Sequence, residues 1–446
     1  MKIIIAGAGE VGYHLAKLLA SESKDIYVID NSPERLAYIQ SHIDVFTVEG
    51  DAKSITVLEQ ANIAKCDLLI AATSSEEVNF LVSVLGKKLG AKKTIIRFNE
   101  SEANKQKYID LFESLGIDTI ISPLEQVADE IVRLLDKPAL TDDVEFEDGN
   151  LVVYGIQLSS DCPLIGKTVS ENILCECAQE FRPIAIHRQN KTSLTGFDLS
   201  LRVRDIIYFI GKKTSIEKAM QLCGKKKREI KKIMILGGSR IGQLTAKKLM
   251  LKYDVTLMEK DPEKCFKLTE TLKECLIVNA DGRDVSGLEE EGLDSMDAFV
   301  AVTGDSETNI ISTLVAKSHH VKKTIAQVEN VDYIHLSQDI GIDTLINKKM
   351  VAASSIFKHV RKGKVDAIAH LHGVNAEIIE FEIHPGIRVA GKPISKIKFN
   401  DQAKIICLVR GKNIIFPDHY EILQVGDKAF VLSLSEAIGR AENYFS

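Results

Sequence analysis

Three glycines near the amino terminus are spaced so that the backbone could hold a phosphate. The stretch Gly7-Ala-Gly-Glu-Val-Gly12 follows a short apolar run and opens an amphipathic segment over about residues 10–22. Gly7 would allow a tight turn, Gly9 would let a pyrophosphate approach the backbone, and Gly12 would let the following helix lie close to the strand. The N–H groups and the dipole at the helix N-terminus would then favour the anion.

An acidic residue stands where such a loop needs one. Asp30 ends the second apolar run, 18 residues after Gly12, and its carboxylate would accept hydrogen bonds from the hydroxyls of an adenosine ribose. Charge-assisted bonds of this kind contribute roughly 1.5–3 kcal/mol. The same carboxylate would repel a 2′-phosphate, and no basic residue follows it directly, so the pattern favours NAD(H) or an adenine nucleotide over NADP. An empty Rossmann-like scaffold is the alternative interpretation.

A second copy of the loop is degenerate. It reads Gly237-Gly-Ser-Arg-Ile-Gly242, so Ser239 replaces the central glycine and Arg240 replaces a glutamate. The serine would crowd a pyrophosphate, although its hydroxyl could also bond to a phosphate, and Arg240 adds a cation. Glu259 can take the place of Asp30 on a ribose. The second copy is therefore either a nucleotide site with different electrostatics or a structural pseudo-site.

Polar and small residues stand at the ends of the later apolar runs. Ligands in open α/β sheets bind outside the carboxyl ends of the strands, so these residues could line the adenine, ribose or nicotinamide positions. Each could equally be a cap or a turn residue. The first copy offers Asp51, Ala52, Thr73, Ser74 and Arg97, and the second copy has Asp281, Thr303 and Gln327 at the positions of Asp51, Thr73 and Arg97.

The two loops are part of a tandem repeat with an offset near 230 residues. Lys2 to Gly12 aligns with Lys232 to Gly242, and Asp67 to Thr73 aligns with Asp297 to Thr303. Within each copy, short apolar runs alternate with amphipathic stretches. This alternation predicts an α/β fold, with a Rossmann-like, doubly wound parallel sheet and helices on both faces. The strands expected in the first copy are 2–6, 26–30, 44–48, 68–72, 94–98 and 118–121.

A smaller domain follows each lobe. An acidic, turn-rich segment at 141–149 ends the first alternation, and the second copy changes in the same way near Gly363. The basic run at 225–232 is typical of a solvated linker, and contact with phosphates or lipid is the alternative. The strands expected in the small α+β lobes are 151–158, 181–188, 205–210, 376–383, 404–410 and 427–433. The domains predicted are 1–140, 141–224, 230–364 and 365–446.

The composition argues against several classes of protein. With 57 Lys and Arg against 63 Asp and Glu, the formal charge is −6, whereas a nucleic-acid-binding protein would usually show a basic field. Eight scattered cysteines form no CxxC pair, which disfavours a zinc ribbon and indicates reduced thiols. No apolar run approaches the ~18–20 residues that span a bilayer, and no cleavable leader is recognisable. Any membrane association is therefore expected to come through a partner.

With these features in place, the whole chain resembles the TrkA family, the regulatory proteins of Trk potassium-uptake systems. The resemblance rests on the Gly7–Gly12 loop with Asp30, the Gly50-Asp51 element, the segment from Thr73 to Asn79 and the order of the four lobes. It implies two RCK domains (regulator of potassium conductance), each an RCK-N lobe followed by an RCK-C lobe. It also implies a cytoplasmic protein, peripheral to the inner face of the membrane, that binds NAD(H), with ATP or ADP as further ligands. Such a protein would gate a TrkH-type potassium-translocating membrane protein as a dimer or tetrameric ring.

Family membership would place the nucleotide contacts at matching positions and implies no catalytic residue and no metal ligand. The contacts in the first copy would be Gly7, Ala8, Gly9, Glu10, Val11, Asp30, Asp51, Ala52, Thr73, Ser74 and Arg97. Those in the second copy would be Gly237, Gly238, Ser239, Arg240, Ile241, Glu259, Asn279, Ala280 and Thr303. The Ser239 and Gln327 replacements leave the ligand of the second copy open.

Two other classes of function stay open at this point. An NAD-dependent oxidoreductase would also carry the loop, but His187 and His372 have no apparent partner by spacing, and the small domain itself repeats. A soluble nucleotide sensor unrelated to ion transport is the third class. If ring gating holds, the helical stretch near 124–137 is the expected hinge. With 350–361 it could supply a dimer contact, although the same periodicity fits burial within one chain equally well.

Overall fold

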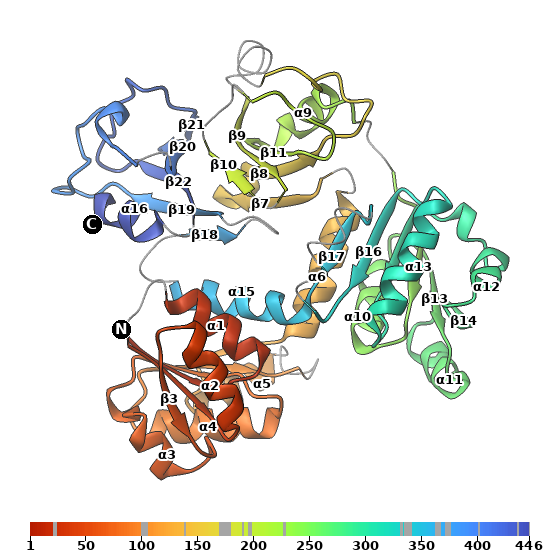
Figure 1. Cartoon of the computed structure of the whole chain (residues 1–446), viewed down its shortest axis with the longest axis horizontal. Coiled ribbons are helices and arrows are strands. Elements are labelled where there is room, and N and C mark those ends of the chain that lie inside the picture. Colours follow the sequence, from red (N-terminus) through yellow and green to blue (C-terminus); the bar gives the residue numbers. More distant parts are fainter. Residues whose placement is uncertain are drawn as a thin grey trace. The chain divides into compact units, whose positions relative to one another are not determined.

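The protein is represented by a computed structural model of the whole chain (Figure 1). The residues it describes are 1–20, 25–99, 106–137, 140–168, 180–189, 191–194, 199–225, 229–330, 333, 341–361, 367–370, 376–399, 402–434 and 437–445. They form two compact units, residues 1–133 with 231–360 and residues 134–230 with 361–446. The first unit holds both large lobes, and the second holds both small lobes.

The first large lobe is a six-stranded parallel sheet in the order β3-β2-β1-β4-β5-β6. One face packs against α1 and α2, and the other against α3 and α4, so the predicted doubly wound fold is confirmed. The strands are β1 Lys2–Ala6, β2 Asp25–Asp30, β3 Phe46–Glu49, β4 Leu68–Ala71, β5 Lys93–Arg97 and β6 Thr119–Ile121. The helices are α1 Glu10–Ala20, α2 Pro33–His42, α3 Ile55–Gln60, α4 Glu76–Lys88 and α5 Gln106–Ser114.

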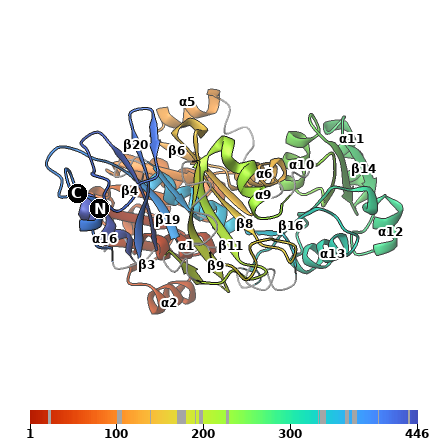
Figure 2. The ribbon, with the colours of Figure 1, turned by 90° about the horizontal axis from the view of Figure 1, so that it is seen from above.

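The second large lobe repeats this topology, with the strand order β14-β13-β12-β15-β16-β17. Its edge strand β14 lies at the outer end of the lobe beside α11 (Figure 2). The strands are β12 Lys232–Leu236, β13 Asp254–Glu259, β14 Leu276–Asn279, β15 Ala298–Ala301, β16 Lys323–Gln327 and β17 Thr344–Ile346. The helices are α10 Arg240–Leu249, α11 Pro262–Thr271, α12 Val285–Glu290 and α13 Ser306–Ser318.

Two long helices join the large lobes within the first unit. Helix α15 (Lys348–Arg361) follows the second lobe in sequence, yet its buried side chains belong to the core of the first lobe. They are Ala352, Ala353, Ile356 and Phe357, and they share that core with Val11 and Leu15 of α1. Helix α6 (Pro123–Asp136) crosses it, and Gln126 Nε2 donates to Ser355 Oγ at 2.6 Å. Asp129 of α6 pairs with Lys248 of the second lobe at 2.7 Å. Helix α15 thus completes the core of the first lobe, and α6 contacts the second lobe through an ion pair.

The second unit consists of two antiparallel sheets, ordered β10-β9-β11-β8-β7 and β18-β19-β22-β20-β21. One core cluster holds apolar side chains of both sheets, among them Phe146, Tyr208 and Phe430. The strands are β7 Asp142–Phe146, β8 Leu151–Gln157, β9 Phe181–Arg188, β10 Lys191–Ser193, β11 Ile206–Lys212, β18 Ala367–His370, β19 Ala376–Glu382, β20 Ala403–Arg410, β21 Asn413–Ile415 and β22 Lys428–Leu434. The helices are α9 Ile216–Leu222 and α16 Ile438–Phe445. The six strands expected from the sequence are present, and four edge strands join them.

Each small lobe contains the same buried ion pair. Arg188 donates through Nε and Nη2 to the two carboxylate oxygens of Asp205, at 2.7 and 2.6 Å. Arg410 binds Asp427 in the same way, at 2.8 and 2.9 Å. Both carboxylates are almost fully buried. A two-bond pair of this kind fixes orientation as well as charge, which gives the two small lobes a common internal anchor.

Candidate functional site

The first glycine loop has the geometry that a phosphate-binding turn requires. Gly7 has a φ of +111°, a conformation that strains other residues, and its N–H donates to the carbonyl of Ile29 at 2.8 Å. A Cβ on Gly12 would lie 1.8 Å from the Gly7 carbonyl oxygen, so the helix can approach only because this residue has no side chain. A Cβ on Gly9 would meet nothing within 4 Å. The loop is therefore tight on the inside and open at the position that a pyrophosphate would approach.

Asp30 is held beside this loop by backbone donors. Its Oδ2 accepts the N–H of Ala8 at 2.6 Å, and its Oδ1 accepts the N–H of Ser32 at 2.9 Å. The residue is 9% exposed at the end of β2. Since two carboxylate oxygens offer about four acceptor positions, these bonds fix the carboxylate and leave acceptor capacity for ribose hydroxyls.

A threonine and an asparagine tie the ends of β4 and β5 together. The Oδ1 of Asn79 accepts the backbone N–H of Thr73 at 2.8 Å and its hydroxyl at 2.7 Å. The amide of Asn79 donates to the carbonyls of Thr73 and Arg97. Thr303 and Asn309 repeat the arrangement in the second lobe. The hydroxyl of Thr73 is thus engaged in a structural clamp. Asn79 recurs as Asn309 in the sequence repeat, but the repeat does not show what the asparagine binds.

The clamp brings Arg97 to the same edge as the loop. Arg97 is partly buried, burial lowers its pKa, and its Nε has no hydrogen-bond partner in the described structure. A buried donor of this kind is suited to an anionic or carbonyl ligand. Gln327 stands at the corresponding position of the second lobe, and its buried Oε1 also has no hydrogen-bond partner in the described structure. Of the other predicted residues, Ala52 is buried and Ser74 is exposed.

Asp51 follows β3 and is part of a small turn. Its Oδ1 accepts the N–H of Lys53 at 3.0 Å, and the Lys53 ammonium lies 3.3 Å away. The backbone bond from Lys53 is the main reason that the pKa of Asp51 is lowered. In the second lobe, Arg283 binds Asp281 at 2.6 Å and lowers its pKa to about 2. Both aspartates stay charged at neutral pH, but each already has a basic neighbour.

A lysine from the second half of the chain reaches the first loop. Lys349 Nζ lies 2.6 Å from Glu10 Oε2, and Glu10 is the first residue of α1. Asn347 caps α15 by accepting the N–H groups of Lys349 and Met350, which fixes the start of that helix. Sequence reasoning missed Lys349, because only the packing of α15 on the first lobe brings it to the loop.

The second lobe places its predicted residues at equivalent positions but with different partners. Ser239 Oγ donates to the carbonyl of Val302 at 2.7 Å and accepts the N–H of Gly242 at 3.3 Å. Glu259 Oε2 accepts the N–H of Gly238 at 3.0 Å and pairs with Lys264. Asn279 and Ala280 donate to the backbone carbonyl of Glu259, Ile241 is buried, and Arg240 is exposed. The polar groups around the loop of this lobe therefore form most of their hydrogen bonds with other residues of the chain.

Comparison with known proteins decides the family. The TrkA-N domain matches residues 3–123 and 233–348, and the TrkA-C domain matches residues 153–224 and 378–446. The Trk system potassium uptake protein TrkA homolog 1 of Methanosarcina mazei is 31% identical over 458 residues, which cover 100% of both proteins. The chain belongs to the TrkA family.

Solved structures show the fold that this chain shares. A crystal structure of the GsuK RCK domain superimposes with a TM-score of 0.61 at 17% identity, covering 100% of this chain and 94% of that one. The GsuK channel bound to NAD gives a TM-score of 0.61 at 18% identity, covering 100% of this chain and 78% of the channel. The four lobes of this TrkA-family chain thus have the RCK fold.

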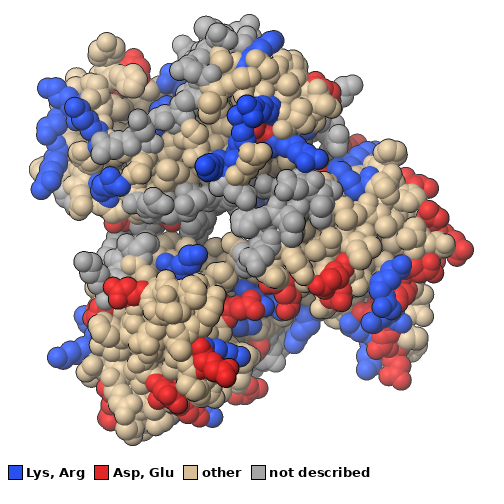
Figure 3. Space-filling model, viewed as in Figure 1, with Lys and Arg blue, Asp and Glu red and all other residues tan. Residues whose placement is uncertain are grey.

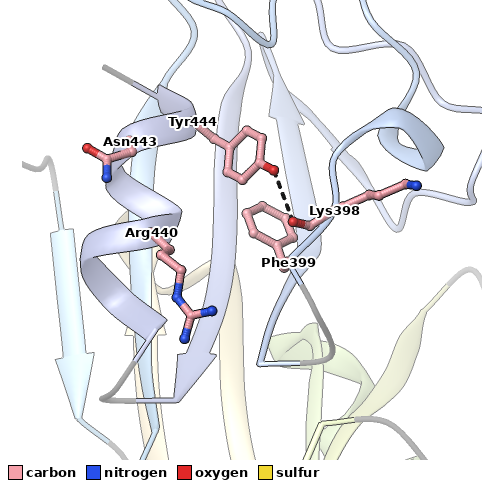
Figure 4. Close-up of a pocket in the computed structure, with 5 residues that line it drawn as sticks. All are labelled: Lys398, Phe399, Arg440, Asn443 and Tyr444. Carbon is pink, nitrogen blue, oxygen red and sulfur yellow. Dashed lines mark hydrogen bonds between the residues drawn. The ribbon is translucent and has the colours of Figure 1, made fainter.

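The small lobes of this TrkA-family protein contain a hollow of about 230 Å³ (Figure 4). It lies beside α16, where the hydroxyl of Tyr444 donates to the carbonyl of Lys398 at 3.0 Å and the Phe399 ring meets Tyr444 edge-on. Arg440 Nη2 donates to Gln402 Oε1 at 2.6 Å. The hollow shares no residue with the predicted nucleotide contacts.

The described part of the TrkA-family chain contains no group of three or more His, Cys, Asp or Glu able to hold a metal ion. His187, which has no apparent partner by spacing in the sequence, contacts Thr192 Oγ1 through Nδ1 at 3.0 Å. His372, considered with it, lies outside the described residues, as do Cys175 and Cys177. Within the same described part, no helix combines the length and apolarity that crossing a membrane requires.

Proposed function

We propose that the protein is a cytoplasmic regulatory subunit that binds NAD(H) or an adenine nucleotide in its first large lobe and thereby gates a TrkH-type potassium-translocating membrane protein. One observation carries the proposal. The first loop is open at Gly9, with the carboxylate of Asp30 held beside it by backbone donors, in a chain that belongs to a potassium uptake family. The predicted domain limits and the nucleotide contacts of the first copy belong to this proposal, whereas the ligand of the second copy stays open.

The choice of nucleotide follows from the charges around Asp30. Its buried carboxylate favours an unmodified ribose and disfavours a 2′-phosphate, and Arg97 adds a cation at the same edge. The GsuK channel, which has the same fold, was solved bound to NAD. NAD(H) is therefore the first ligand to test, with ATP and ADP next.

Gating would follow from a difference in nucleotide affinity between two states of a dimer or tetrameric ring. A 100-fold preference at one site corresponds to about 2.7 kcal/mol. Taking a channel from mostly closed to mostly open needs about 5.5 kcal/mol, so two coupled sites would suffice. In the view of Figure 3, Asp and Glu are numerous over the two large lobes, which supports a protein partner rather than nucleic acid.

The hinge is proposed to lie in α6. The division between the two compact units falls within this helix after Arg133, and within α15 at the corresponding point of the second copy. A designed disulfide that locks α6 should abolish the nucleotide response of potassium flux. An unchanged response in the locked protein would refute this placement.

Reconstitution with the membrane partner tests the proposed function. The full chain and a TrkH-type protein in potassium-loaded proteoliposomes should show a flux that changes with NADH or ATP, and Asp30→Ala should remove the NADH response. Steady NADH absorbance during the assay would exclude turnover, whereas NADH consumption would favour an oxidoreductase. Failure of the two proteins to associate under any nucleotide condition would favour a sensor unrelated to ion transport.

A further inference from the structure

Two side chains in the second large lobe occupy the positions that a dinucleotide would need. We infer that Ser239 and Lys264 exclude NAD(H) from the second lobe, so that the chain binds one dinucleotide, in the first lobe. This inference rests on the proposed function for the first lobe. It assigns a role in specificity to two residues that differ from their counterparts in the first lobe, Gly9 and Arg35.

The first of these positions is the N-terminus of α10. A phosphate bound at a helix N-terminus accepts N–H groups that have no partner within the helix. Here Ser239 is the N-cap residue, its Oγ accepts the N–H of Gly242 at 3.3 Å, and its O–H is anchored on the Val302 carbonyl at 2.7 Å. In the first lobe this position is Gly9, which has no side chain and open space around it. The serine hydroxyl therefore stands where a pyrophosphate oxygen would bind.

The second position is the ribose carboxylate. Lys264 Nζ lies 2.8 Å from Glu259 Oε2, which also accepts the N–H of Gly238 at 3.0 Å. The other oxygen of Glu259 accepts the N–H of Asp261 at 3.2 Å. The carboxylate thus has three protein donors and is only 8% exposed, so ribose hydroxyls would have to displace a charged partner.

The first lobe lacks this obstruction. Arg35 occupies the position that corresponds to Lys264, two residues after the proline that starts each helix, and its side chain is exposed. Among the ion pairs of the described residues, none joins Arg35 to Asp30. The carboxylate of Asp30 has two backbone donors, from Ala8 and Ser32, and no Lys, Arg or His of the described residues pairs with it. The two lobes therefore differ at the phosphate position and at the ribose position, and both differences favour a dinucleotide in the first lobe.

Binding stoichiometry of NADH on the full chain tests this inference. Fluorescence titration at protein concentrations well above Kd should give one NADH per wild-type chain. The double variant Ser239→Gly with Lys264→Met should give two. Lys267→Met changes an exposed lysine of the same helix and should leave the value at one. Circular dichroism and thermal unfolding confirm that each variant is folded.

The outcomes separate this inference from the proposed function. Two NADH per wild-type chain would overturn the inference, as would a folded double variant that still binds one. Adding Asp30→Ala to the double variant should leave one NADH, bound in the second lobe. A wild type that binds none, with a double variant that binds one, would support the exclusion by Ser239 and Lys264 while refuting the proposed site in the first lobe.

Discussion

The two large lobes have the same scaffold and different binding edges. Both have the same strand order, a positive φ at the first loop glycine, and the same Thr–Asn clamp between strand ends. They differ at the central loop residue, Gly9 or Ser239, and at the acidic residue, where Glu259 pairs with a lysine and Asp30 does not. The hydrogen bonds that hold the fold are therefore separate from those that would hold a ligand. The ligand-binding residues can differ between the lobes while the hydrogen bonds of the fold stay the same.

The largest expected effect tests the shared scaffold. Gly12→Ala places a Cβ 1.8 Å from the Gly7 carbonyl oxygen, and Gly242→Ala places one 2.0 Å from the Gly237 carbonyl oxygen. Each should destabilise its lobe by about 3 kcal/mol, because backbone on both sides must move. Denaturant unfolding of the two variants measures the loss. Stability equal to wild type in either variant would show that the two loops are not built alike.

A pH-dependent difference in stability is the next largest effect. Lys323 begins β16 and is 2% exposed, whereas Lys93, its counterpart in β5, is exposed. Burial lowers the pKa of Lys323 from 10.5 to about 8, with Asp343, Lys317 and two residues of α6, Arg133 and Glu130, as charged neighbours. Because the pKa is lower in the folded state, the folded protein should gain stability as the pH rises from about 8 to 10.5.

Lys323→Met isolates this effect. At pH 7 the variant should be more stable than wild type by about 2 kcal/mol, since a buried charge is replaced by an apolar side chain. The difference should shrink as the pH rises toward 10. Thermal unfolding at several pH values measures it, and Lys93→Met should show no such trend. A constant difference across the pH range would contradict the burial of a charged lysine.

A substitution at the loop separates binding from stability. Gly9→Ser gives the first lobe the residue of the second, and there is room for the side chain because nothing lies within 4 Å of its Cβ position. Stability should change by less than about 0.5 kcal/mol. NADH affinity should fall about tenfold, or 1.4 kcal/mol, because the hydroxyl occupies the phosphate position. Unchanged affinity in a fluorescence titration would show that this position does not face the ligand.

The smallest expected effect concerns Lys349 of α15, which pairs with Glu10 at the first loop. Lys349→Met leaves Glu10 without its partner at 2.6 Å and puts an uncompensated carboxylate beside the phosphate position. Partly exposed ion pairs contribute about 0.2–1 kcal/mol, so NADH affinity should fall no more than about fivefold. Lys348→Met is the matched control, because both lysines lie near Glu329, at 3.8 and 3.6 Å, whereas among the ion pairs of the described residues only Lys349 reaches Glu10. Equal NADH affinities in both variants would show that α15 does not contribute to the nucleotide site.

The strands of the large lobes could be predicted from sequence because buried parallel strands are continuous apolar runs. The run at 2–6 and the strand Lys2–Ala6 coincide. The edge strand Lys191–Ser193 was missed, since three polar residues carry no such signal. The glycine loop and Asp30 could be located because their chemistry is local in the sequence. Lys349 and its packing on the first lobe could not, because no sequence pattern shows which lobe a helix will cover.

Calorimetric titration of the purified chain with NADH, alongside Asp30→Ala and Glu259→Ala, tests the central claim most directly. We expect the wild type to bind NADH. We also expect Asp30→Ala to weaken binding about tenfold to hundredfold, through loss of charge-assisted bonds of roughly 1.5–3 kcal/mol, while Glu259→Ala leaves the affinity unchanged. Wild-type affinity in a folded Asp30→Ala protein would contradict the account.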